Sequence, residues 1–561
     1  MNKEWLYKNT ITPSTVDEWR QVLLQNRGID SEEAIKDFFD QKHPYTIALE
    51  EVGIDVKQMR KAVTRLKIAI DKKQKVAIFG DYDADGNCAT AIIWRGLKLM
   101  GLVAHPFIPH RTEHGYGMNE RSYKAFREAF GDEQPDLIVS VDNGIVANET
   151  IGKFVADGID VIVTDHHCPD KTLPECSAVV HTNDLCGAGV AWFLIRYLLE
   201  AHLPDGWSGN DELNSLLGLV ALATITDQVP VIGVNRRLVK AGLIALSKEK
   251  KSGMAELMRQ AKVDPTKINE YDLGFALGPR INAVGRMANT LDGVRLLCTN
   301  HPEKSIELAT TISQLNEDRK DLTWDMIDLA EEQIDQKKLP KIIIVAHEQF
   351  HEGIIGLIAG RLADKYYRPA IAVSLSGGVA KGSARSIKGV NVTDLLRQTR
   401  EHLLDVGGHE MAAGFSADLK EYPKLVKKLN KLGETFVDEK ELKPRLWLDN
   451  KVTLDLLVDP DGYELISALK PHGVGNDQVK VGLTAKVTEV RTIGSEGQHC
   501  KLSIVDDTAS AIMPVLIWGC KDKGVSFKEG DEIELAATVG LNDFNGKKSL
   551  QLVYLDGRLK N

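Results

Sequence analysis

No apolar run in this 561-residue chain approaches the ~18 residues that a membrane-spanning helix needs. The first twenty residues, MNKEWLYKNTITPSTVDEWR, lack the apolar centre of a secretory signal. Low-complexity tracts and internal repeats are also missing, and the hydrophobic and charged fractions, 43% and 27%, are ordinary for a globular protein. The sequence therefore excludes disordered and fibrous classes, and it predicts a protein of several domains without a membrane partner.

Cysteine is scarce, and its spacing excludes two common uses. The seven cysteines form no Cys-x-x-Cys pair, and their number is odd: Cys88, Cys168, Cys176, Cys186, Cys298, Cys500 and Cys520. This pattern argues against both a disulfide framework and a zinc ribbon. It favours a reducing compartment, so we expect a cytoplasmic protein.

An overall excess of positive charge is missing too. Lysine and arginine total 70 against 80 for aspartate and glutamate, which gives a formal net charge of −10. A nucleic acid is not excluded as a partner, because phosphate contacts need a local basic surface and not a basic chain. Carboxylates gathered around a metal would also count towards the −10.

The first two-thirds of the chain alternates between strand and helix patterns. Residues 1–70 carry helical periodicity, and three short runs rich in valine and isoleucine follow at 76–80, 137–141 and 161–164. Each run precedes a helical stretch, which is typical of a parallel sheet covered by helices on both faces. Residues 303–337 then predict one long helix, and a second α/β pattern covers 342–375.

From about residue 479 the pattern becomes all-β. Five short strands are expected at 481–490, 499–505, 511–517, 531–540 and 549–555, as in a small barrel such as an OB-fold. Trp518, Phe544 and Tyr554 are candidate stacking aromatics there, although the barrel core is the more common place for an aromatic, and we expect it for Trp518. The predicted domains are an N-terminal helical region 1–70, an α/β domain 71–300, a connecting helix 301–339, a second α/β domain 340–445 and the barrel domain 446–561.

The strongest local motif is Gly80-Asp-Tyr-Asp-Ala-Asp-Gly86, directly after the first predicted strand. Asp and Gly together usually form only a polar turn. Three alternating aspartates, however, repel one another unless cations lie between them. The spacing argues against an EF-hand loop, since Ile92 stands where such a loop needs its twelfth-position acid.

Further acids and imidazoles follow the other predicted strands. Asp142 ends the second strand, Asp165-His166-His167 ends the third, and Asp227 follows a later helical stretch. The carboxyl ends of parallel strands meet at one edge of the sheet, where open α/β sheets bind ligands. Carboxylates with imidazole suit Mn²⁺ or Mg²⁺, and five or six such ligands suffice for two ions that promote phosphoryl hydrolysis.

A second cluster lies in the C-terminal half. Gly382-Ser-Ala-Arg-Ser386 offers a hydroxyl, backbone amides and a guanidinium, and Gly407-Gly-His409 allows close approach of a ligand. Arginine can bind phosphate bidentately. Each segment alone is more simply explained as a loop with a salt bridge.

Taken together, these motifs resemble the DHH phosphoesterase superfamily. GDYDADG, the Asp142-Asn-Gly turn, Asp165-His166-His167 and Asp227 resemble its four motifs, and the segments 347–353, 382–386 and 407–414 resemble the DHH-associated domain. Four more segments are similar to those of the superfamily's single-strand-specific DNA exonucleases: 109–117, 186–191, 278–286 and 471–476. The resemblance covers nearly the whole chain.

The resemblance implies a fold and an activity. The fold is a parallel-sheet DHH domain and a DHH-associated α/β domain joined by a long helix, plus a C-terminal OB-fold barrel. The activity is 5′-to-3′ hydrolysis of single-stranded DNA to 5′-mononucleotides in repair or recombination, with two Mn²⁺ or Mg²⁺ ions. Single-stranded DNA is the implied partner, with a single-strand-binding protein and a helicase as further ones.

The resemblance also assigns roles residue by residue. It implies that the metals are held by Asp81, Asp83, Asp85, Asp142, His166 and Asp227. His167 would face the scissile phosphate, and Asp165 would orient the imidazoles. Substrate would be bound by Arg111, Arg280, Ser383, Arg385 and His409.

The chain departs from the superfamily's usual pattern at two places. Phe350 replaces a tryptophan, and Asn87-Cys88 follows GDYDADG where Val or Ile and then Thr are common. Two alternatives to the exonuclease stay open. One is another DHH phosphodiesterase, acting on oligoribonucleotides or cyclic dinucleotides, but such relatives generally lack the barrel. The other is a non-catalytic scaffold that binds single strands, which the complete set of proposed ligands disfavours.

Overall fold

A computed structural model describes residues 3–40, 42–203, 211–287, 290–494, 497–508, 511–521, 523–544 and 547–560. The chain forms two compact units. Unit 1 comprises residues 1–42, 230–233 and 444–561, and unit 2 comprises residues 43–229 and 234–443. The segment 1–70 thus contributes to both units.

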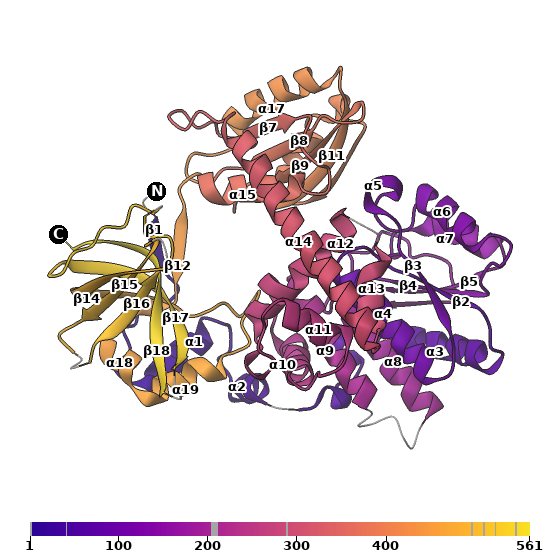
Figure 1. Ribbon diagram of the computed structural model, residues 1–561, viewed down its shortest axis with the longest axis horizontal. Helices are drawn as coiled ribbons and strands as arrows, with labels where there is room; N and C mark the ends of the chain where they lie inside the picture. Colours follow the sequence, from indigo (N-terminus) through magenta and orange to yellow (C-terminus); the bar gives the residue numbers. More distant parts are fainter. Residues whose placement is uncertain are drawn as a thin grey trace. The chain divides into compact units, whose positions relative to one another are not determined.

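Unit 2 contains a five-stranded parallel sheet of order β3-β2-β4-β5-β6. Its strands are β2 (Val76–Phe79), β3 (Ala104–Phe107), β4 (Leu137–Val141), β5 (Asp160–Asp165) and β6 (Ala178–His181). β2 and β4 are buried along their whole length because helices cover both faces. Figure 1 shows α6 (Glu120–Phe130) and α7 (Asn148–Ala156) on one face, and α3 (Val56–Asp71), α4 (Ala84–Leu99) and α8 (Gly187–His202) on the other. The predicted parallel sheet is confirmed.

Helices follow the sheet and lead to the second α/β part. They are α9 (Asp211–Thr226), α10 (Gly233–Ser247), α11 (Gly253–Gln260), a π-helix (Asp272–Leu277), α12 (Gly278–Met287), α13 (Leu291–Cys298) and the 30-residue α14 (Pro302–Glu331). The long helix predicted over 303–337 exists, but it ends at Glu331, before a turn that precedes Pro340.

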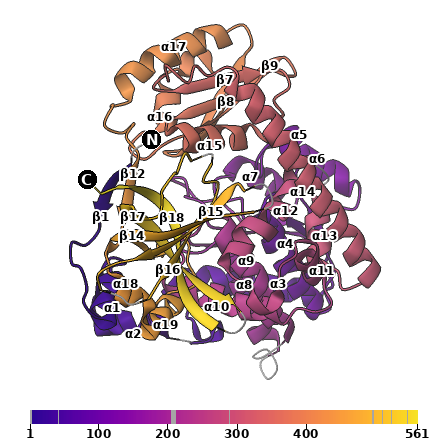
Figure 2. The ribbon, with the colours of Figure 1, turned by 60° about the vertical axis from the view of Figure 1, so that its left-hand side comes forward.

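The second sheet of unit 2 has the order β10-β11-β9-β8-β7. Its strands are β7 (Ile343–His347), β8 (Ala370–Ser374), β9 (Val379–Arg385), β10 (Asp405–His409) and β11 (Ala412–Asp418). Leu425 and Leu429 of α17 (Tyr422–Phe436) pack on one face, and α15 (Ile355–Tyr366) packs on the other. Figure 2 shows the two helices on opposite sides of the sheet.

Unit 1 is built around a barrel. β14 (Lys480–Ile493), β15 (His499–Val505), β16 (Met513–Ile517), β17 (Glu532–Phe544) and β18 (Lys547–Leu559) close through the pairing of β14 with β17. α18 (Leu454–Val458), α19 (Pro460–Ala468), α1 (Val16–Gln25) and α2 (Glu32–Phe39) accompany it, and Trp19 and Leu23 of α1 are fully buried in the barrel's core cluster. β1 (Glu4–Tyr7) pairs in parallel with β12 (Arg445–Leu448). The predicted OB-like barrel is confirmed.

One expectation about the barrel was wrong, and one feature of it was not expected. A disulfide joins Cys500 and Cys520, whose Cα atoms are 5.9 Å apart, because the pairing of β15 with β16 brings residues twenty apart in sequence together. Trp518, expected in the core, is 48% exposed because it lies just beyond the end of β16. Tyr554 is buried, and the side chain of Phe544 lies outside the described residues.

None of the described helices combines the length and the apolar composition needed to cross a membrane.

Candidate active site

The GDYDADG segment forms the turn between β2 and α4. The Asp83 carboxylate caps α4 by accepting the Gly86 N–H at 3.0 Å. Asp85 stands in the first turn of α4, and its two oxygens accept the N–H groups of Gly187 and Ala188 at 2.6 and 2.7 Å. These two donors form the N-terminus of α8, whose dipole favours a negative charge there. Two helix starts therefore fix Asp83 and Asp85.

Asp142 follows β4 in the left-handed conformation, with φ 59°, and is 1% exposed. Its side chain lies against Gly187, where any Cβ would come within 2.7 Å of the Asp142 Cβ. The glycine at the start of α8 is therefore required for Asp142 to reach the sheet edge next to Asp85.

His166 joins acids from separate elements. Its Nε2 lies 3.1 Å from Asp142 Oδ1, 3.7 Å from Asp85 Oδ2 and 3.6 Å from Asp227 Oδ2. Asp81 and Asp83 form a further group with Asp142, in which the ligand atoms all lie within 4.8 Å of one another. The structure thus brings together all six residues expected to hold metals.

His167 is held by Asp165 on one side and by Tyr116 on the other. Asp165 Oδ1 lies 2.8 Å from His167 Nδ1 and accepts the backbone N–H groups of His166 and His167, while its Oδ2 accepts the Ile145 N–H at 2.8 Å. The Tyr116 hydroxyl lies 2.9 Å from His167 Nε2. Burial lowers the pKa of His167, but the hydrogen bond and charge of Asp165 outweigh it and raise the pKa to about 9. The imidazole is therefore cationic at neutral pH in the metal-free protein.

The carboxylates of this centre repel one another in a buried place. Burial, together with the neighbouring acids, raises the pKa values of Asp81, Asp85 and Asp142, and raises that of Asp227 to about 8. Asp81 Oδ1 is buried and makes no hydrogen bond within the described part of the chain. These buried carboxylates lack a neighbouring positive charge that would offset their repulsion. Together with the imidazole, they fit one or two divalent cations.

We expect Mn²⁺ to raise the melting temperature of the protein by about 5–10 °C at a concentration of ~100 Kd, because binding to the folded state alone adds about 2.7 kcal/mol per ion. Differential scanning fluorimetry with Mn²⁺ and with EDTA measures this shift. Asp142→Asn should abolish most of it. An equal shift in that variant would mean that the ions bind elsewhere.

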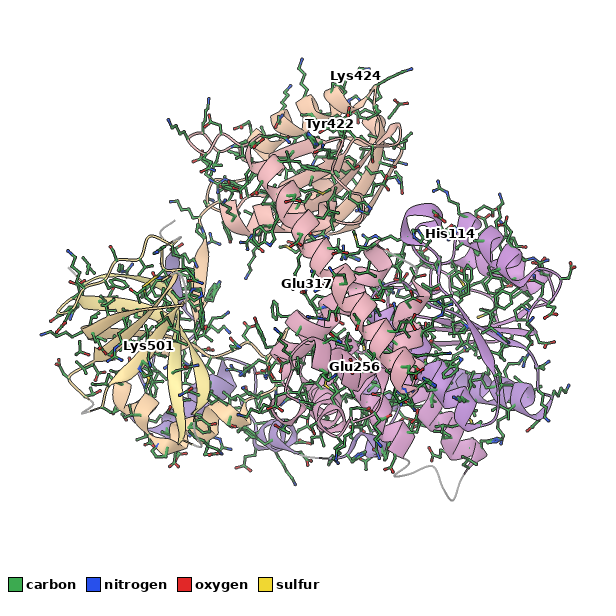
Figure 3. All side chains as sticks on the ribbon, in the orientation of Figure 1. His114, Glu256, Glu317, Tyr422, Lys424 and Lys501 are labelled. Atoms are coloured by element: carbon green, nitrogen blue, oxygen red, sulfur yellow. A yellow bond between two sulfur atoms is a disulfide. The ribbon has the colours of Figure 1, made fainter. Side chains whose placement is uncertain are left out.

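Arginines gather beside the metal centre, at the approach of the second sheet. Arg111 begins the short helix α5 (Arg111–His114), which Figure 3 marks at His114, and its guanidinium carbon lies 5.1 Å from the Tyr82 ring centroid. Arg286, near the end of α12, donates to the Gly353 carbonyl at 2.9 Å. Burial and the charges of Arg111, Arg319 and Arg385 lower its pKa to about 10. Burial and Arg111 lower the pKa of Arg385 as well. Such mutual repulsion favours an anion between these side chains.

Ser383 lines a small pocket on the second sheet, and Arg385 lies next to it, against Gly356 of the pocket wall. The Arg385 Nη1 atom donates to Ser383 Oγ at 3.0 Å. Across the sheet, Ser383 is in register with Gly414 and then with Gly407, and these glycines leave the space beside its hydroxyl free of side chains. A pocket of about 300 Å³ results, and Arg111 lines it together with Ser383 and Gly356. Lys381, which is paired with Glu352, and Asp405 line it as well. We call this pocket, together with Arg286 and Arg385, whose charges act on Arg111, the arginine pocket; its Arg and Ser donors are groups that bind a phosphate.

Two of the predicted substrate residues have different surroundings. His409 is exposed and aligns with Arg385 across β11, two strands away. Arg280 donates to the Ala276 carbonyl at 2.7 Å and lies 3.9 Å from Glu317 of α14, which Figure 3 labels. The arginine of the 278–286 motif that joins the cluster is Arg286. Sequence reasoning missed this residue and Tyr116, although both stand in motifs it had singled out.

Comparison with known proteins gives matches along most of the chain. The DHH family, N-terminal domain, matches residues 75–224, the DHHA1 domain matches residues 339–434, and the RecJ OB domain matches residues 448–556.

Relatives and solved structures match over long stretches. The single-stranded-DNA-specific exonuclease RecJ of Bacillus subtilis (strain 168) is 33% identical over 95% of this chain and 67% of that protein, and the one of Haemophilus influenzae is 31% identical over 88% and 89%. The crystal structure of RecJ in complex with Mn²⁺ from Thermus thermophilus matches with a TM-score of 0.80 and 27% identity, over 100% of this chain and 80% of that one. The Mg²⁺ complex from the same organism matches with a TM-score of 0.74 and 26% identity, over 100% and 79%.

Proposed function

The chain belongs to the RecJ family of single-stranded-DNA-specific exonucleases, and from this premise we propose that it hydrolyses single-stranded DNA from the 5′ end and releases 5′-mononucleotides. One observation carries the proposal. The carboxylate centre and the arginine pocket lie in the same unit. α12 connects them, because Asn282 accepts a hydrogen bond from Ala84 of the GDYDADG turn and Arg286 lies close enough to Arg111 and Arg385 for their charges to lower its pKa.

The metal centre is the place of hydrolysis. We assign Asp81, Asp83, Asp85, Asp142, His166 and Asp227 as ligands of two Mn²⁺ or Mg²⁺ ions. When bound there, such ions act as Lewis acids on a phosphate oxygen and make the attacking water more acidic. Asp165 fixes the ring of His167, and the imidazole would then stabilise negative charge that develops on the scissile phosphate.

The arginine pocket accounts for polarity. A terminal phosphate carries more negative charge than an internal one. Arg111 and Ser383 in the pocket, with Arg286 and Arg385 next to it, would supply the donors that it needs. Holding the 5′ end at a fixed distance from the metals would set cleavage one nucleotide from that end. A cyclic dinucleotide has no terminal phosphate, so the pocket favours a linear strand.

Family membership also supports a wider role. We propose that the enzyme acts in DNA repair or recombination in the cytoplasm, and that a single-strand-binding protein and a helicase are its partners. Co-purification with each of these proteins, with and without single-stranded DNA, tests the partner proposal.

The activity is tested with single-stranded DNA labelled at its 3′ end, incubated with the protein and Mn²⁺. We expect a ladder of shortening labelled products and an intact duplex control. Release of the label as a mononucleotide at the outset would mean the opposite polarity. An intact strand that stays bound would favour the scaffold, and an intact unbound strand would direct attention to short oligoribonucleotides and cyclic dinucleotides.

A further inference from the structure

Two exposed aromatic side chains lie at the π-helix that precedes α12, Tyr271 directly before its first residue and Phe275 within it. Tyr271 is 62% exposed and Phe275 is 70% exposed. Their rings are stacked, with centroids 4.7 Å apart and an angle of 24° between the planes. Leu273 and Leu277 of the same segment are fully buried. The segment is thus anchored by its leucines, while the aromatic pair takes no part in packing the core.

The π-helix is tied to the metal centre by close packing. A Cβ on Gly274 would lie 3.3 Å from the Ile225 side chain, and one on Gly278 would lie 2.0 Å from the Thr226 side chain. These are the last residues of α9, directly before Asp227. π-helical turns are rare and occur frequently at functional sites. The aromatic pair therefore sits on a rigid segment beside a proposed metal ligand.

α12 relates this pair to the arginine pocket. Phe275 and Arg286 are separated by eleven residues of continuous helix, roughly 15 Å at about 1.5 Å per residue. Between them, Asn282 Oδ1 accepts the Ala84 N–H at 2.8 Å, and Gly285 lies against the Tyr82 carbonyl. Along the π-helix and then α12, the chain therefore passes the aromatic pair first, the metal-binding turn next and the arginine pocket last.

We propose that Tyr271 and Phe275 form a stacking platform for a base of the single strand that lies beyond the first two nucleotides, on the 3′ side of the bond that is cut. The proposal rests on the proposed function, because the 5′ end then occupies the arginine pocket. A negative charge beside the pair disfavours a phosphate, so an uncharged base fits this place better. Asp272, beside Tyr271, uses its carboxylate to accept the Asn269 N–H at 3.0 Å. Aromatic rings bind any base by its face, without regard to sequence.

The platform also gives Arg280 a role. Its guanidinium donates to the carbonyl of Ala276, one residue after Phe275, and thereby holds the turn that presents the ring. Arg280 is thus a positioning residue for the platform.

Strand length provides the first test. We expect the double variant Tyr271→Ala/Phe275→Ala to raise KM for a 5′-phosphorylated oligonucleotide about tenfold with little change in kcat. The kinetics of a 5′-phosphorylated dinucleotide should stay unchanged, because its bases end before the platform. Phe275→Trp should retain the wild-type KM. Ile244→Ala, which removes an exposed apolar side chain from α10, is the matched control and should have no effect.

A scan of abasic positions gives a sharper test. In metal-free buffer, we expect the wild type to bind about tenfold more weakly to strands that lack the base at one position near the 5′ end, and the double variant to show no such position. A wild type that degrades the strand but gives a flat abasic profile would overturn the platform alone. The same would follow from equal losses on the oligonucleotide and the dinucleotide, which would mark a structural effect or another occupant, such as a protein. A wild type that does not degrade the strand would overturn the proposed function itself.

Discussion

Asp142→Asn is expected to lower kcat about a thousandfold and, at the same time, to raise the melting temperature of the metal-free protein. The loss of activity follows because a metal-held carboxylate contributes several kcal/mol to transition-state stabilisation, and about 1.36 kcal/mol corresponds to tenfold in rate. The substitution keeps the shape of the side chain, and asparagine tolerates the left-handed backbone found at this position, φ 59°.

The gain in stability has an electrostatic cause. Burial first, and then the charges of Asp85, Asp83, Asp81 and Asp227, raise the pKa of Asp142 above its ordinary value. A raised pKa in the folded state means that stability is present at low pH and is lost as the pH rises. The advantage of Asp142→Asn should therefore be larger at pH 8 than at pH 5.

Single-turnover digestion and thermal unfolding in EDTA measure the two effects. Glu128→Gln on α6 changes an exposed carboxylate and should alter neither. Activity within tenfold of the wild type would remove Asp142 from the metal centre. A lower melting temperature for the metal-free variant at both pH values would contradict the account of mutual repulsion.

Arg385→Ala is expected to reduce kcat/KM on 5′-phosphorylated strands about a hundredfold and to leave 5′-hydroxyl strands nearly unaffected. Hydrogen bonds to charged groups contribute about 1.5–3 kcal/mol, and the guanidinium can make two of them to one phosphate. Arg385→Lys should recover only part of the loss, since an ammonium lacks the planar fork.

The comparison of two 5′ ends is the decisive measurement, because a misfolded variant would lose both. Arg295→Ala, an exposed arginine on α13 paired with Asp292, is the matched control and should keep the wild-type preference. An equal loss on phosphorylated and hydroxyl ends would show that Arg385 acts on the fold or on internal phosphates, and the pocket would then not explain polarity.

Local sequence patterns were sufficient to predict the parallel sheet of unit 2 and the polar residues at the carboxyl ends of its strands. β2, β4 and β5 are continuous apolar runs, so their carboxyl ends could be located, and parallel topology then places the following acids together. The contribution of α8 could not be derived in this way. Its Gly187 makes room for Asp142 and its N-terminus binds Asp85, and both contacts depend on packing between residues far apart in the sequence.

The resemblance did not predict which of Arg280 and Arg286 lies near the arginine pocket. Both arginines stand in one motif, and the spacing does not tell which one points to the pocket. On α12 they are six residues apart, which leaves them on different sides and at different heights of the helix. Packing decides the matter, since Arg280 is engaged with Ala276 and Glu317, while Arg286 meets Gly353 and the other arginines.

The way unit 1 is assembled from both ends of the chain bears on how the protein is made. Residues 1–42 share unit 1 with residues 444–561 and the short segment 230–233, and their partners β12 and the barrel core lie after residue 444. During synthesis from the N-terminus, the apolar faces of α1 and α2 therefore remain exposed while nearly four hundred residues of unit 2 are made and fold. A chain released before residue 444 is made would therefore contain a folded metal centre but an N-terminal segment 1–42 whose apolar side chains are exposed. Exposed apolar surface of this kind is what chaperones bind.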